Sequence, residues 1–216
     1  MMEAGSTREA LRGLRSSDPD EAARAADALY RSGAATQALA EPAAGESLCA
    51  SVAAGNRSAS AVLLLGYVPG AADLLNKLAR EHGDAPVKLR PWSDVVPLRL
   101  AALAALSRLG DSEARQRLLE LTSDLDTAGR LFLLDVLPFL DAPEVWHAIG
   151  DYMRDAHEIR VDVPSGAMRR RVCDHAVDAF LDRFAFPVSF ERKPGGRYGT
   201  AEIEETQRAL RSSIPQ

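Results

Sequence analysis

Cysteine is scarce in this chain, and this scarcity limits the chemistry that the chain can carry. Cys49 and Cys173 are the only two cysteines among 216 residues, and they match no metal-ligand spacing and no paired-cysteine redox motif. We expect both to be small buried hydrophobic residues in a reduced compartment rather than a disulfide. The sequence therefore predicts neither a metal site nor a cofactor.

Excess positive charge and long hydrophobic runs are also missing. The 31 Asp and Glu residues outnumber the 26 Lys and Arg residues, and the formal net charge is -5. A chain without excess positive charge is a poor binder of phosphate backbones, so we expect no nucleic-acid partner. The longest apolar stretches, near 61–65 and 98–106, are too short to cross a bilayer. Because the N-terminus also lacks the apolar core of a signal peptide, the sequence predicts a cytoplasmic protein without membrane contact.

The sequence does contain a succession of helical patterns. Hydrophobic periodicity predicts helices, and no strand, near 7–15, 20–32, 46–54, 58–67, 71–82, 94–109, 112–123, 127–140, 143–155, 166–184 and 200–212. Asp18 stands before Pro19 as an N-cap signal. Gly33, Gly83 and Gly110 follow helical stretches, where we expect left-handed C-caps.

The order of the helix types is more informative than their number. The stretch 95–109 is apolar almost all the way round, and the next helix, 112–123, has one apolar stripe and one charged face. The pair 129–140 and 143–155 repeats this order. A helix that is apolar on most sides must be covered, whereas a two-faced helix covers one neighbour and meets water with its other side. This alternation predicts stacked helix pairs.

Five arginines head segments that resemble the first helix of HEAT repeats. Arg24, Arg57, Arg99, Arg130 and Arg170 are each followed by Ala or Leu and by a Leu or another large apolar residue about a turn later, and they are separated by 33, 42, 31 and 40 residues. The resemblance implies an all-α fold, a right-handed α-solenoid of about five stacked antiparallel helix pairs in a single domain over 1–216. It also implies that the chain is a curved scaffold whose partner is another protein.

The C-terminal segment departs from this pattern. We expect 185–199 to form an extended arm and 200–213 to form a capping helix, because the last repeat of an array must cover its apolar face. The arm mixes aromatic and basic residues, so it has two interpretations. It either plugs the open end of the array or grips a partner.

Two groups of polar residues are candidates for chemistry or for structural pairing. The cluster Cys173-Asp174-His175 with Asp178 has the side chains of a metal or nucleophile site, but Cys173 falls on the apolar stripe of its helix, so a structural role is favoured. Asp135 is the only acidic residue in an apolar helix and needs a partner. Arg99 on a neighbouring repeat is the first choice, as an inter-repeat ion pair.

A partner-binding surface is predicted on the helix 143–155. Trp146 and Met153 fall together at the edge of the core stripe, with His147, Asp151 and Arg154 on the outward face. An aromatic residue beside a flexible thioether, rimmed by polar residues, is typical of an interface anchor. The alternative is that a neighbouring helix or the loop 156–166 covers both residues.

The sequence leaves three classes of function open. The first is a non-enzymatic, monomeric scaffold or adaptor that binds another protein. The second is an inhibitor or immunity-type protein that neutralises a cationic protein target, for which small size and net negative charge are suggestive. The third is an enzyme on a helical-repeat fold, as in DNA glycosylases or bilin lyases, and this hypothesis rests on analogy of fold alone.

Overall fold

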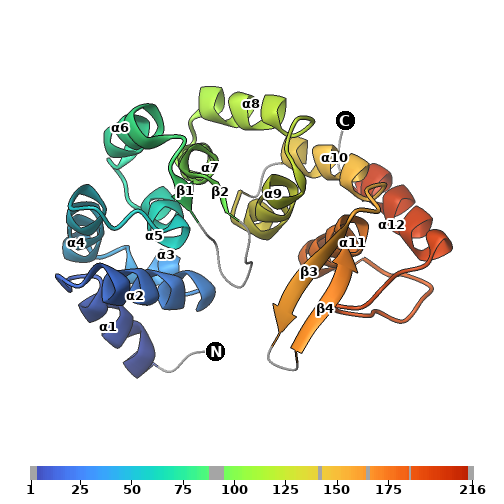
Figure 1. Ribbon diagram of the computed structural model, residues 1–216, viewed down its shortest axis with the longest axis horizontal. Coiled ribbons are helices and arrows are strands. Elements are labelled where there is room, and N and C mark those ends of the chain that lie inside the picture. The colour runs from blue at the N-terminus through green and yellow to red at the C-terminus, as the bar shows by residue number, and fades with distance from the viewer. Residues whose placement is uncertain (1–3, 88–94, 141–142, 164–165, 185, 214–216) are drawn as a thin grey trace. The chain divides into compact units, whose positions relative to one another are not determined.

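A computed structural model describes residues 4–87, 95–140, 143–163, 166–184 and 186–213, which are mostly helical (Figure 1). The side chains of 4–6, 137–138, 143–145, 148–149 and 159–168 lie outside this description. Described residues up to Leu118 form one compact unit, and those from Leu119 onward form a second. The predicted mainly helical class is therefore confirmed, whereas the single domain over 1–216 stays a prediction.

The first unit consists of helices and one very short strand pair. Its elements are α1 (Ala4–Gly13), α2 (Pro19–Arg31), α3 (Ala35–Ala38), α4 (Pro42–Ala53), α5 (Ala59–Leu64), the 3-10 helix η1 (Leu65–Tyr67), α6 (Ala72–His82), β1 (Pro86–Val87), β2 (Val96–Pro97) and α7 (Leu98–Arg108). The Asp18 side chain accepts a hydrogen bond from the Asp20 amide at 2.9 Å, which caps α2 ahead of Pro19 as the sequence predicted.

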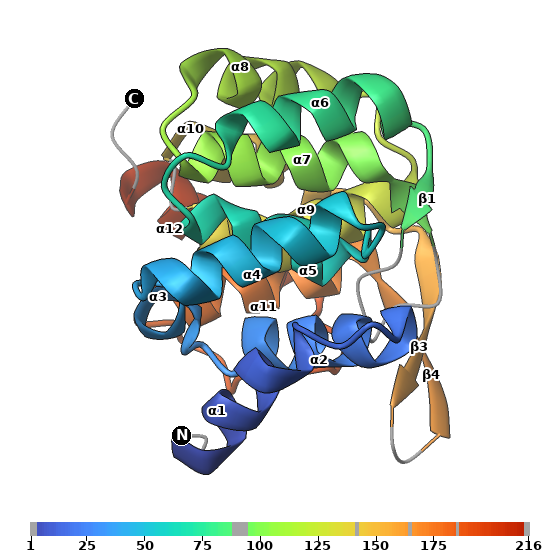
Figure 2. The same ribbon diagram turned by 90° about the vertical axis from the view of Figure 1, so that its left-hand side faces the viewer.

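The helices of this unit form two rows. The inner row runs from α2 to α5 to α7, and each of these helices packs on the next. The outer helices α1, α4 and α6 each pack on one inner helix (Figures 1 and 2). All residues of α5 are buried, as are all residues of α7 except Arg99 and Arg108. The apolar pattern of 95–109 thus corresponds to a helix that is covered on most sides.

The second unit repeats this two-row packing with fewer helices. After α8 (Ser112–Leu121), which crosses the boundary between the units, come α9 (Thr127–Leu140), α10 (Pro143–Tyr152), β3 (Glu158–Val163), β4 (Gly166–Arg171), α11 (Val172–Phe184) and α12 (Thr200–Ser213). The inner helices α9 and α11 pack on each other, and α10 and α12 cover them. In the part of the chain that the structure describes, no helix is long and apolar enough to span a membrane.

The prediction that the chain has no strand is wrong in both units. β1 and β2 pair in the first unit. In the second unit 158–163 pairs antiparallel with 166–171, with Glu158 opposite Arg171 and Val163 opposite Gly166, so α11 begins at Val172 and not at 166. The segment 158–163 alternates apolar and charged residues with the period of two that strands show. That alternation is the signal from which the hairpin was predictable.

Two buried aspartates of α11 hold the C-terminal arm. Asp178 accepts hydrogen bonds from the Tyr198 hydroxyl at 2.5 Å and from the Gly195 amide at 2.9 Å, and it also pairs with Arg170. Asp174 accepts from the Tyr198 amide at 2.9 Å and from the Arg171 guanidinium at 2.7 Å. These bonds fasten the arm to α11, where the sequence left its role open.

The acidic cluster of α11 therefore has a structural role, as the sequence analysis favoured. Burial opposes the ionisation of Asp174, but bonds from Arg171 and from the Tyr198 amide outweigh it and lower the pKa of this carboxyl. Burial, followed by the hydrogen bond to Asp178, raises the pKa of Tyr198 to about 12. Cys173 is buried beside them. The arm is thus bound through charged carboxylates and a neutral phenol.

We predict that Tyr198→Phe lowers the free energy of unfolding by about 1–3 kcal/mol, because it removes the bond to Asp178 and the bond that the hydroxyl accepts from the Lys193 amide. Urea unfolding measures this loss. Arg197→Gln is the control from the same arm, since its ion pair with Glu158 is exposed to solvent and its loss should change the stability little. Equal losses in the two variants would contradict the assignment.

Candidate functional site

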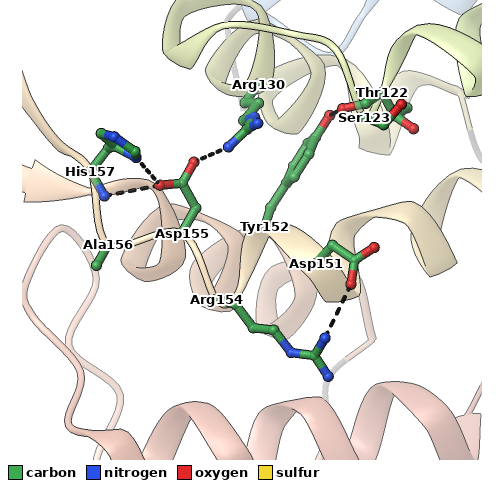
Figure 3. Close-up of a pocket in the computed structure, with 9 residues that line it drawn as sticks. All are labelled: Thr122, Ser123, Arg130, Asp151, Tyr152, Arg154, Asp155, Ala156 and His157. Atoms are coloured by element: carbon green, nitrogen blue, oxygen red, sulfur yellow. Dashed lines mark hydrogen bonds and ion pairs between the residues drawn. The ribbon is translucent and has the colours of Figure 1, made fainter.

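An open pocket of about 720 Å³ lies in the second unit (Figure 3). It is bounded by the segment after α8, by the first turns of α9, and by the end of α10 with the link 153–157 that follows it. The lining residues are Thr122, Ser123, Arg130, Asp151, Tyr152, Arg154, Asp155, Ala156 and His157.

Asp155 is the centre of the polar contacts in this pocket. Its carboxylate accepts hydrogen bonds from Arg130 Nη1 at 2.5 Å, from the His157 amide at 2.9 Å and from His157 Nδ1 at 2.7 Å (Figure 3). The side chain of Asp155 is only 5% exposed, whereas that of His157 is 78% exposed. The carboxylate is thus enclosed by its donors, and the imidazole faces outward.

The ionisation of Asp155 follows from these contacts. Burial opposes the charged form, but the bonds from His157 and from the Arg130 guanidinium outweigh burial and lower the pKa of this carboxyl below its ordinary value. A carboxylate without a proton only accepts hydrogen bonds, so His157 Nδ1 carries a proton and donates it in the bond to Asp155. Nε2 of the ring makes no contact with the other residues of the pocket that Figure 3 labels.

Tyr152 forms the inner wall of the pocket. Its hydroxyl donates to the carbonyl oxygen of Thr122 at 2.8 Å, and its ring lies 5.6 Å from the guanidinium carbon of Arg130. Burial raises the pKa of Tyr152, so the phenol stays protonated. The Tyr152 hydroxyl therefore links the end of α10 to the segment before α9, and its proton is donated in this hydrogen bond.

The backbone of the link fixes the next inner helix. The Cys173 amide donates to the carbonyl oxygen of Asp155 at 2.9 Å, and the Val172 amide donates to that of His157 at 3.1 Å. These are the first two amides of α11, which have no acceptor inside their own helix. Asp155 thus holds Arg130 with its side chain and α11 with its main chain.

The predicted anchors of the partner surface belong to the core instead. Trp146 is 2% exposed and Met153 is 1% exposed. The Trp146 ring meets the ring of Phe184 on α11 edge-on, with centroids 4.9 Å apart. A residue at the border of an apolar stripe is covered when a helix packs beside that border, and the sequence of α10 does not reveal where α11 lies. The prediction of a docking surface centred on these two residues is therefore wrong.

The polar rim predicted around those anchors is exposed. His147 lies on the surface, whereas Asp151 and Arg154 line the pocket and pair with each other at 3.5 Å. The helical pattern of 143–155 predicts a core stripe of Val145, Ala148, Ile149 and Tyr152. Tyr152 is buried as expected, and the side chains of Val145, Ala148 and Ile149 lie outside the described residues.

The predicted ion pair between Asp135 and Arg99 is replaced by two others. Asp135 accepts from His175 Nε2 at 2.9 Å, and Arg99 pairs with Asp84 at the surface. His175 Nδ1 lies 3.0 Å from Arg170 Nη1, and an arginine only donates, so Nδ1 accepts and Nε2 carries the proton toward Asp135. The helical pattern correctly showed that Asp135 needs a partner, but it could not identify a residue forty positions later.

Sequence reasoning found Arg130 only as a repeat anchor and missed Asp155 and His157 as site residues. Asp155 ends a helical pattern, and His157 lies in a short polar link, so neither has a periodic environment that marks it. The sequence contained one usable signal, which is the Asp-Ala-His spacing that lets a carboxylate reach the amide two residues on.

We predict that Trp146→Ala lowers the free energy of unfolding by about 3–5 kcal/mol, since it empties a large volume in the core. Chemical denaturation followed by circular dichroism measures the change. Arg154→Ala is the control, because its side chain is 64% exposed and its loss should stay below about 0.5 kcal/mol. A similarly small effect of the tryptophan variant would show that Trp146 is not a core residue.

We predict that Asp155→Asn costs about 1–3 kcal/mol at neutral pH, because it weakens the charged bonds to Arg130 and His157. The pKa of Asp155 is lowered in the folded state, so this contribution is complete above about pH 5 and is lost as the pH falls below about 4. Unfolding curves of both proteins should therefore converge in acid. Glu113→Gln, in an exposed pair with Arg117, should cost less than about 0.5 kcal/mol at either pH.

Comparison with known proteins identifies no relative for this arrangement. The chain matches no protein-family model, no curated protein and no solved structure.

Proposed function

We propose that this chain is a non-enzymatic, protein-binding scaffold or adaptor, built from HEAT-like helix pairs that continue through both units as one right-handed α-solenoid. The observation that carries the proposal is that the two units use the same chain order. Each unit contains an inner helix, an outer helix, a short link, a pair of strands and a further inner helix, in this order. In the first unit these are α5, α6, 83–85, β1–β2 and α7. In the second unit they are α9, α10, 153–157, β3–β4 and α11.

The hydrogen bonds of the two links support this equivalence. The Leu98 amide donates to Ala85 at 2.9 Å and the Arg99 amide donates to Gly83 at 2.9 Å, just as the first two amides of α11 donate to His157 and Asp155. The separations between the five arginines are consistent with this equivalence of the two units. The longer separations of 42 and 40 residues are those that contain a hairpin, and the shorter ones of 33 and 31 do not.

Repeated helix pairs typically serve to present an extended surface, with insertions gathered in loops of one edge. In the second unit such a loop carries a pocket whose rim, Asp151, Arg154 and His157, is polar and exposed. Polar rims of this kind surround protein contacts. The pocket is therefore the region where we place a partner in this unit.

One observation favours an enzyme as the alternative. A histidine held by a buried carboxylate, with Nε2 open, is the arrangement of a general base. The ring of His157 is 78% exposed, however, and proton transfer by an enzyme benefits from a site that excludes water. Neutralisation of a cationic protein target belongs to the binding class and rests on net charge alone. The expected cytoplasmic location and monomeric state stay predictions.

We predict that a photo-crosslinking amino acid at position 154 captures a discrete protein adduct in cells, because this side chain borders the pocket without supporting the core. The same amino acid at position 208, an exposed residue of α12, is the matched control. Denaturing gels followed by mass spectrometry of the adduct give the readout. Adducts of equal yield at both positions, or none at position 154, would count against a partner at the pocket.

A further inference from the structure

The first unit has its own pocket at the place that corresponds to the pocket of Figure 3. It has a volume of about 230 Å³ and lies among the end of α4, the residue Arg57 ahead of α5, and α6. The pocket of the second unit likewise lies among the segment after α8, Arg130 on α9, and the end of α10. Its lining residues are Val52, Ala53, Arg57, Leu74, Lys77, Leu78, Glu81 and His82.

The hydrogen bonds of the links align the two links with each other. Because Gly83 and Asp155 each accept from the second amide of the following inner helix, they occupy the same position. Arg57 precedes Gly83 by 26 residues, and Arg130 precedes Asp155 by 25. Each arginine thus lies a similar number of residues before the equivalent link position, Arg57 just ahead of α5 and Arg130 in the first turns of α9. That link position is a carboxylate in the second unit and a glycine in the first.

Gly83 cannot be exchanged for an acidic residue without moving the backbone. A Cβ atom at this position would overlap the carbonyl oxygen of Ala79. The backbone at Gly83 is helical, and not left-handed as the sequence predicted, so close approach is the reason that glycine is needed here. The first unit thus has no room for a side chain at the link position that Asp155 occupies in the second unit.

Arg57 is left with unused donors. No hydrogen bond or ion pair joins its half-buried side chain to any other residue within the described ranges, and its Nε is buried without an acceptor. Nε of Arg130 is also buried without an acceptor. The difference lies in the terminal nitrogens, because Nη1 of Arg130 donates to Asp155, whereas no bond from Arg57 to another described residue corresponds to it. A half-buried guanidinium with unused donors favours a carboxylate, which can accept two parallel hydrogen bonds from it.

A second cation lines the pocket with Arg57. This residue is Lys77, and the acidic residue of the lining, Glu81, lies within 4.0 Å of Arg80. The chain as a whole is acidic, with a net charge of -5, so nothing but a local positive site would attract an anion here.

We propose that this pocket binds a carboxylate of an acidic segment on a protein partner, which takes at Arg57 the place that Asp155 takes at Arg130. The proposal rests on the protein-binding function proposed above and names the chemistry of the partner. It differs from the sequence-based alternative of a cationic target, because the free charges of the pocket are positive.

The test is fluorescence anisotropy of a fluorescein-labelled peptide of six glutamates at low ionic strength, with peptides of six glutamines and six lysines as comparisons. We expect saturable binding of the glutamate peptide to the intact chain and at least roughly tenfold weaker binding to Arg57→Gln. Arg57→Lys keeps the charge without the planar fork and should fall between the two. Circular dichroism and thermal unfolding establish that each variant is folded.

Arg117→Gln is the matched control, because it removes the same charge from an exposed ion pair on α8. Its affinity should stay within about twofold of the unchanged protein. The proposal is overturned if Arg117→Gln loses as much affinity as Arg57→Gln, if Arg57→Lys binds as tightly as the unchanged protein, or if the lysine or glutamine peptide binds as well as the glutamate peptide. The absence of saturable binding to the intact chain would also overturn it.

The outcome at Arg57 can be separated from the fate of the scaffold proposal. If the adduct captured from position 154 forms equally well with Arg57→Gln while the glutamate peptide does not bind, the scaffold proposal stands and the Arg57 site is rejected. If neither an adduct nor peptide binding is observed, both are rejected.

Discussion

The second unit depends on the contacts of one residue, Asp155. Its carboxylate holds Arg130 on α9 and the imidazole of His157, while its carbonyl oxygen accepts the amide of Cys173 at the start of α11. A short link between an outer helix and a hairpin has few apolar residues with which to fix its path. Charged hydrogen bonds to a buried carboxylate supply that constraint. The inner helices α9 and α11 and the pocket that Asp155 lines therefore share one anchor.

In the first unit the corresponding link is fixed without charged side chains. There the link is Gly83 to Ala85, its carbonyl oxygens again hold the first amides of the inner helix α7, and close approach of the backbone to Ala79 leaves no room for a side chain. The link of the first unit is thus fixed by close packing of the backbone, and the link of the second unit is fixed by an ion pair. The two pockets therefore differ in chemistry, because Arg130 pairs with Asp155, whereas no ion pair joins Arg57 to another of the described residues.

The C-terminal arm shows the same use of buried carboxylates. Asp174 and Asp178 are close to fully buried, and each is satisfied by an arginine together with groups of the arm. Burying a charge is costly unless partners and hydrogen bonds compensate, so such residues fix a unique arrangement of the segments that supply those partners. The aromatic residues of the arm join the apolar interior, with the Phe186 ring 6.5 Å from that of Phe180.

The sequence alone determined the helical class, the covered character of 95–109 and the start of α2 at Asp18, because these depend on periodicity and on residues adjacent in the chain. It also indicated that Asp135 needs a partner. The tertiary structure decided which partner that is, since His175 lies on another helix, and it decided that Trp146 and Met153 are core residues, since α11 covers the edge of their stripe. The hairpin 158–171 was missed because the arginines at its end were assigned to the helix that follows. Pairings across the pocket at Asp155 join residues 25 positions apart, and local pattern carries no information about contacts at that distance.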